Sequence, residues 1–165
     1  MIRPAIVALS MFAAAAAADS ASRKAHDFIE EAVVSSTFEV ETSLLALRTS
    51  KDPEIKKFAD MMVSDHGKLR SELQMFAKKQ GIDLSDTLDA ERSNALGKLE
   101  RSQPIEAPYI DSQLRGNAQM VNLFEDYAEN GDDAELQNLA VKTLPTLRSH
   151  LKEIEEMSTR VGSTR

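Results

Sequence analysis

The chain contains no cysteine and no tryptophan, and aromatic residues make up only 5% of its 165 residues. The lack of thiols excludes disulfides, thiol nucleophiles, and thiolate sites for zinc or iron–sulfur clusters. The scarcity of aromatic residues, beside plentiful Ala, Leu, Glu and Lys, is unfavourable for a β-sheet. This balance predicts helices that pack on helices.

A basic stripe and a glycine-rich phosphate loop are also missing from the sequence. Lys and Arg number 20 against 27 Asp and Glu, which gives a formal net charge of −7 at pH 7. This charge argues against nucleic acid as a partner. After residue 18 no stretch is apolar enough to span a bilayer, so we expect no transmembrane helix once the N-terminal segment is removed.

The first 18 residues have the layout of a secretory signal peptide. MIRP carries one Arg, and AIVALSMFAAAAAA is an uncharged run that ends in small residues. Ala16 to Ala18 form an A-x-A cleavage site. The alternative is an uncleaved N-terminal anchor. We therefore expect an exported protein, located in the periplasm or associated with the cell envelope.

Apolar residues recur at helical spacing in four long segments, which predicts helices over 23–49, 53–80, 106–129 and 133–159. A short helix is predicted over 89–101. In the second long helix Asp52 is the expected N-cap, Pro53 the first helical residue and Gly81 the C-terminal stop. In the first, the expected inward residues are Phe28, Ile29, Ala32, Val33, Ser36, Val40, Leu44 and Leu47.

Four long stripes of this kind predict a four-helix bundle. Antiparallel neighbours usually need loops of only about 2–8 residues, whereas the connection between the second and third long helices is much longer. We therefore predict an all-α, ferritin-like bundle in which these two helices are parallel and their connection contains the short helix. The expected division is a signal peptide over 1–18, a polar lead over 19–22, the bundle over 23–160 and a frayed tail over 161–165.

Two long stretches of the chain are FEVETSLLALRTSKDPEIKKFADMMVSDHGKLRSEL (38–73) and YIDSQLRGNAQMVNLFEDYAENGDDAELQNLAVKTLPTLRSHL (109–151). Both stretches resemble the DUF4142 family. The resemblance implies an exported bacterial protein with a ferritin-like helical fold, of a kind often labelled as a predicted outer-membrane protein. It implies no activity. Members usually carry a histidine in the third long helix, where this sequence has Asn117.

The residues needed for a ferritin-type di-iron site are incomplete. Such a site takes a Glu from each of two helices and a Glu-x-x-His pair from each of the other two. The residues three positions before His66 and His150 are Val63 and Leu147. Ferroxidase chemistry is therefore not expected, and the sequence favours a non-catalytic protein over an enzyme.

A smaller metal site remains compatible with the sequence. At a rise of about 1.5 Å per residue, Glu39, His66 and His150 come to similar depths in the predicted bundle. Two imidazoles and a carboxylate suit Fe, Zn or Cu. Asp65, Glu41 and Asn117 are the possible neighbours of this site.

The competing interpretation treats the same side chains as a structural polar network. His66 would bond a carboxylate such as Glu39, and His150 would bond carbonyls freed by Pro145, which removes one helical hydrogen bond. His26 is expected to be a solvated surface residue.

Two functions therefore follow from the sequence. The first is a non-catalytic structural or accessory protein of the envelope, with a homo-oligomer or an envelope protein as partner. The second is a metal-binding protein that uses His66, His150 and Glu39, with a link to stress by analogy.

Overall fold

The computed structural model describes residues 10–85 and 87–162, and the side chains of residues 23–85 and 87–160. This part of the chain forms five helices and no strand: α1 (Ser10–Thr49), α2 (Pro53–Gln80), α3 (Ala90–Glu100), α4 (Glu106–Asn130) and α5 (Ala134–Gly162). The predicted all-α class is confirmed. Residues 1–9 of the expected signal peptide and residues 163–165 of the expected tail lie outside the described residues.

The ends of α2 follow from local hydrogen bonding. The Asp52 carboxylate accepts hydrogen bonds from the backbone N–H groups of Glu54 (2.8 Å) and Ile55 (3.3 Å), two donors that have no partner inside the helix. Gly81 adopts the left-handed conformation, with φ of 68°, that commonly ends a helix. Both ends of the predicted helix are confirmed.

Helix α1 begins earlier than the sequence pattern predicts. Its backbone is helical from Ser10, so it includes residues 10–18 of the expected signal peptide and the expected polar lead at 19–22. At the other end of the chain, α5 continues to Gly162, into the segment expected to be frayed.

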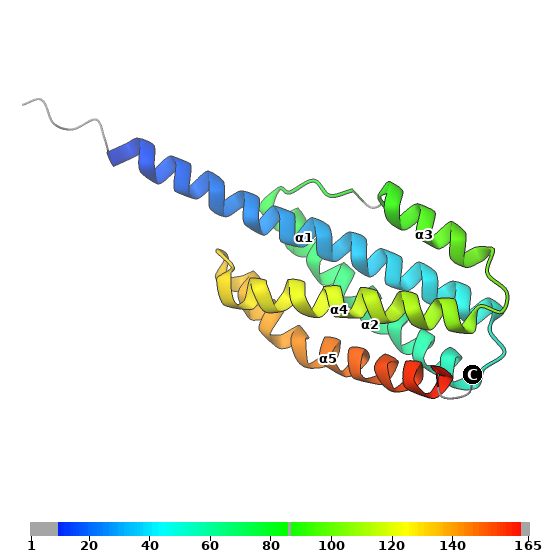
Figure 1. Cartoon of the computed structure of the whole chain (residues 1–165). Coiled ribbons are helices and arrows are strands. Elements are labelled where there is room, and N and C mark those ends of the chain that lie inside the picture. Colours follow the sequence, from blue (N-terminus) through cyan, green and yellow to red (C-terminus); the bar gives the residue numbers. More distant parts are fainter. Residues whose placement is uncertain (1–9, 86, 163–165) are drawn as a thin grey trace, which may run out of the picture.

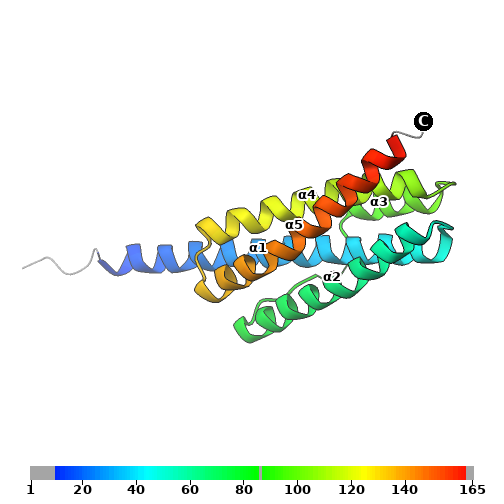
Figure 2. The same ribbon diagram turned by 90° about the horizontal axis from the view of Figure 1, so that it is seen from below.

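The long connection between α2 and α4 gives the bundle its topology. Figure 1 shows that α2 and α4 run in the same direction, and that the connection from α2 to α4, which carries α3, returns along the outside of the bundle beside α1. Figure 2 shows α1 and α2 as one antiparallel pair, and α4 and α5 as the other. The predicted parallel arrangement of the second and third long helices is therefore confirmed.

Helix α1 is the central element, since it contacts α2, α4 and α3. Its residues 32–37 are all buried, which places buried side chains around most of its circumference. The single inward stripe predicted for α1 is therefore wrong at its C-terminal end. Leu44 and Leu47 are half-buried, and the buried residues there are Leu45 and Ala46.

The core is divided into two hydrophobic clusters. One is built around Phe28, Leu73 and Phe124, and the other around Phe58, Tyr109 and Ile154. Between them lies a set of buried polar residues from all four long helices, here called the polar layer. Its members are Ser36, Glu39, Thr42, Ser43, His66, Gln113, Asn117 and His150.

Replacement of Phe28 by Ala is expected to lower the free energy of unfolding by about 3–5 kcal/mol. The Phe28 ring stacks on Tyr127, with centroids 4.0 Å apart, and meets Phe124 edge-on at 5.0 Å. Met75→Ala is the control, because Met75 is 62% exposed, and it should change stability by less than about 0.5 kcal/mol. Urea denaturation followed by circular dichroism measures both. Equal losses in the two variants would contradict this account of the core.

Candidate metal centre in the polar layer

The two histidines predicted as ligands lie side by side in the core. His66 of α2 is 1% exposed and His150 of α5 is 2% exposed. Their ring centroids are 5.6 Å apart, with an angle of 37° between the ring planes. The sequence pattern put both residues on inward faces, and the structure brings the two rings together.

Each of these imidazoles has one nitrogen in a hydrogen bond and one without a partner. His150 Nε2 lies 3.1 Å from Asp65 Oδ2, and His66 Nδ1 lies 3.4 Å from Ser36 Oγ. His150 Nδ1 and His66 Nε2 have no hydrogen-bond partner within the described protein. Asp65 is on the rim of the core, with a side chain 32% exposed and Lys68 3.6 Å away.

Both imidazoles are neutral at physiological pH. Burial lowers the pKa of His66 to about 3, and the nearby His150 adds to this effect. Burial also lowers the pKa of His150, while Asp65 partly offsets the shift. Because a metal ion binds neutral imidazole, the pair is already in the protonation state that a ligand needs.

Glu39, the predicted carboxylate ligand, lies in the same layer but faces α4. It is 1% exposed, and its Oε2 atom has no hydrogen-bond partner. Burial raises its pKa to about 8, and the Gln113 amide and the charge of Arg92 offset part of the shift. Gly116 makes room for the carboxylate, because a Cβ atom at residue 116 would lie 1.8 Å from Glu39 Oε1.

The α4 amides next to Glu39 are held by a defined network. The Thr42 hydroxyl donates to the Phe38 carbonyl (2.8 Å), so it accepts the hydrogen bond from Gln113 Nε2 (2.9 Å). Asn117 Nδ2 donates to the backbone carbonyl of Gln113 (2.9 Å). These bonds fix the amide orientations and leave Gln113 Oε1 and Asn117 Oδ1 without donors.

The structure corrects the hydrogen-bond partners expected from the sequence. His66 bonds Ser36 rather than Glu39, and His150 bonds Asp65 rather than carbonyls near Pro145. Pro145 lies on the exposed side of α5, which remains helical through it.

The predicted ligands do not all converge on one point. The donor atoms of Glu39, His66 and His150 are not all within 4.8 Å of one another. Of the remaining predicted neighbours, Asn117 is buried in the polar layer and Glu41 is half-buried on α1.

Sequence reasoning overlooked a closer cluster on the surface of α1. In the described part of the chain, His26, Asp27 and Glu30 are the one set of three His or acidic side chains whose donor atoms all lie within 4.8 Å of one another. His26 Nδ1 is 3.6 Å from a carboxylate oxygen of each partner. The sequence pattern H-D-x-x-E within a predicted helix could have indicated this cluster. The His26 side chain is 39% exposed, so this cluster is solvated.

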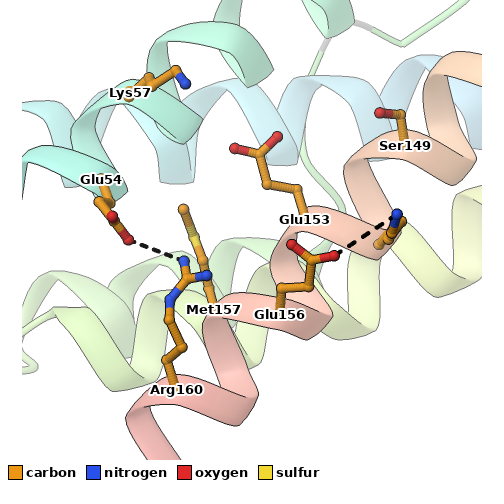
Figure 3. Close-up of a pocket in the computed structure, with 8 residues that line it drawn as sticks. Glu54, Lys57, Ser149, Glu153, Glu156, Met157 and Arg160 are labelled. Carbon is orange, nitrogen blue, oxygen red and sulfur yellow. Dashed lines mark hydrogen bonds and ion pairs between the residues drawn. The ribbon is translucent and has the colours of Figure 1, made fainter.

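A surface pocket of about 370 Å³ between α2 and α5 lies near the C-terminal end of α5. Figure 3 shows Glu54 and Lys57 from α2 facing Glu153, Met157 and Arg160 from α5. Glu54 Oε2 and Arg160 Nη2 are 3.0 Å apart. The pocket contains none of the partnerless buried atoms, so its charged lining offers no comparable binding site.

The sequence profile of a domain of unknown function, DUF4142, matches residues 10–157. The chain belongs to the DUF4142 family. No curated protein matches its sequence.

Solved structures of similar fold share little sequence with this DUF4142 protein. CopM in its Cu(I)-bound form has 16% identity and a TM-score of 0.71, over 82% of this chain and 96% of CopM. CopM in a silver-bound form, obtained by soaking, has 17% identity and a TM-score of 0.68, again over 82% of this chain and 96% of CopM. A DUF305 fragment from Deinococcus radiodurans has 12% identity and a TM-score of 0.72, over 83% of this chain and 96% of the fragment. These similarities establish the helical-bundle fold.

Within the described residues, no helix of the DUF4142 protein combines the length and apolar character needed to cross a membrane.

The stability of the protein relative to a Glu39→Gln variant should fall as pH rises from about 4.5 to about 8. In this range the carboxyl is protonated when folded and ionised when unfolded, so unfolding releases a proton and becomes easier at higher pH. The slope is at most about 1.4 kcal/mol per pH unit. Urea titrations of both proteins at several pH values measure the difference. A difference that is constant or grows with pH would contradict the buried position of Glu39.

Proposed function

We propose that the protein is an exported, non-catalytic accessory protein of the bacterial envelope that binds a copper ion through His66 and His150. The observation that carries this proposal is the state of the two buried imidazoles. Each is neutral, each has one ring nitrogen in a hydrogen bond, and each has its other nitrogen without a partner.

The spacing of the rings suits a shared ion. An imidazole nitrogen binds a metal at about 2.0–2.1 Å, so two rings on one ion have centroids roughly 5–6.5 Å apart for tetrahedral to linear geometry. The observed separation of 5.6 Å lies in this range. His66 Nε2 and His150 Nδ1 are the nitrogens that would bind, because the other two face Ser36 and Asp65.

Asp65 would act by orienting His150. A carboxylate that accepts the second N–H of a ligating histidine fixes its tautomer and makes the free nitrogen a better ligand. The contact of 3.1 Å between Asp65 Oδ2 and His150 Nε2 has this arrangement. Asp65, predicted as a neighbour of the metal site, is therefore proposed as a positioning residue.

Copper is favoured among the metals predicted from the sequence. Imidazole sites suit Zn, Cu and Fe, and Cu²⁺ binds most tightly among divalent first-row ions. The fold is shared with CopM, whose structures contain Cu(I), Cu(II) and silver. Glu39 is proposed to stay outside the copper site, because the donor atoms of the three residues are not all within 4.8 Å of one another and the Glu39 carboxyl lies against Gly116 of α4.

The cellular location in this proposal depends on the signal-like sequence at 1–18. The non-catalytic assignment depends on the missing Glu-x-x-His pairs, since these residues build the di-iron sites of related bundles.

The untagged protein should bind about one copper ion per chain, and the ion should be lost in His66→Gln and His150→Gln. Asp65→Asn should weaken binding by about 10–100-fold, because the histidine ligand loses its orientation but stays in place. Competition with a chromogenic Cu(I) chelator measures the affinity, and mass spectrometry measures the stoichiometry.

His26→Gln is the matched control, because it removes an imidazole from the surface cluster and leaves the core unchanged. It should keep the copper affinity of the wild type. If copper binding is lost in His26→Gln but kept in both core variants, the copper site is the surface cluster and not the histidine pair. Absence of copper binding in the wild type would leave His66 and His150 as a structural network.

A further inference from the structure

A groove of about 490 Å³ runs over the polar layer between α1, α3 and α4. Its volume is in the range of small-molecule sites, about 300–1,000 Å³. Half-buried apolar side chains line part of it, namely Phe38 of α1, Ala95 of α3 and Leu123 of α4. The groove therefore offers an apolar surface to a ligand of moderate size.

Glu39 is one of the residues that line this groove. Glu39 is 1% exposed, and its Oε2 atom has no hydrogen-bond partner. Gly116 also lines the groove, and any larger residue there would collide with the Glu39 carboxyl. A buried carboxyl with an unused oxygen thus lies beside an opening in the protein surface.

The basic side chains around the groove already form ion pairs with carboxylates of the same chain. The Arg92 guanidinium contacts Glu31 and Asp89, and it donates a hydrogen bond to Ser35 Oγ at 2.8 Å. The Arg115 guanidinium contacts Asp111 on its own helix.

Neither of these guanidinium groups forms an ion pair with Glu39, and Arg92 acts on it only through its electric field. The groove also carries Glu31 and Glu91 at its edge. The group that best complements Glu39 is therefore a cation from outside the chain.

We propose that the groove binds a small primary amine, with its ammonium group on the Glu39 carboxylate and its alkyl stem against Phe38, Ala95 and Leu123. An ammonium group has three donors and no acceptor, which complements an oxygen that lacks a donor. The alkyl stem distinguishes this ligand from a simple metal cation, which would leave the apolar lining uncovered.

The pKa of Glu39 agrees with this assignment. Burial raises it to about 8, which is the behaviour of a carboxyl without a bonded cation. An ammonium ion in direct contact favours the ionised form and removes the penalty for burying the charge.

The probe for this site is n-butylammonium, titrated into the copper-free protein at about pH 8 and followed by NMR chemical shifts and calorimetry. Saturable 1:1 binding is expected, with shifts at residues of α1, α3 and α4. Glu39→Gln should weaken it at least about tenfold, since the amide removes the negative charge that would accept the ammonium hydrogen bond. Ala95→Phe, which fills the groove from α3, should abolish binding.

Butanol and butyrate of matched size should not bind, and potassium at equal concentration should not compete. Glu72→Gln, on the exposed face of α2, is the control variant and should bind like the wild type. Equal binding of butanol or butyrate, competition by potassium, or no saturation would overturn the assignment. If Glu39→Gln fails to fold, Ala95→Phe decides the question, because residue 95 is half-buried on the outer helix.

This site does not depend on copper binding. The same titration in a protein carrying both His66→Gln and His150→Gln should give the same affinity for n-butylammonium. A loss there, in a folded variant, would show that the groove and the histidine pair are one site.

Discussion

The arrangement of this bundle depends on the polar layer, which lies between the two hydrophobic clusters and belongs to neither of them. Five atoms of that layer, in Glu39, His66, Gln113, Asn117 and His150, are buried without a hydrogen-bond partner. The Gln113 and Asn117 oxygens are acceptors, the Glu39 oxygen is an acceptor when the carboxyl is ionised, and His150 Nδ1 is an acceptor when Nε2–H donates to Asp65. Each such group costs roughly 1–3 kcal/mol when it stays unsatisfied. A core with this many acceptors and few donors is suited to cations.

The central position of α1 explains why the layer extends across the whole bundle. Most of the circumference of α1 is covered by α2, α4 and α3, so polar residues on different sides of it face different neighbours. Ser36 faces His66 of α2, whereas Ser43 faces Tyr109 of α4 at 2.9 Å. Arg92 holds α3 against α1 through Glu31 and Ser35. The layer is therefore divided into a histidine side and a carboxyl side.

The periodicity of the sequence predicted the fold because it reports which face of each helix is buried. The buried residues of α2, from Ile55 to Phe76, recur at helical spacing along one face of the helix. The length of the 81–105 connection predicted that α2 and α4 are parallel. A short loop can only join antiparallel helices, because a connection between parallel helices must first return along the whole bundle. Periodicity failed for α1, where a helix covered on several sides has no single inward stripe.

The candidate site was predictable only in part, for a geometric reason. A rise of about 1.5 Å per residue gives the depth of a side chain in the bundle, and it correctly put Glu39, His66 and His150 in one layer. Depth does not determine direction around the helix axis. Ser36 and Glu39 are three positions apart on α1, and this is enough for one to face His66 and the other Gly116. Asp65 lies next to His66 in the sequence, yet it contacts His150 on the neighbouring helix.

We propose that the paired imidazoles of α2 and α5 form a metal site. X-ray absorption spectroscopy of the copper-loaded protein examines this pair, because multiple scattering from imidazole rings counts the histidines bound to the ion. Two imidazoles are expected on the ion in the wild type, and one in His150→Gln at high copper concentration. An ion without imidazole ligands, or one whose spectrum is unchanged in His66→Gln and His150→Gln, would contradict it.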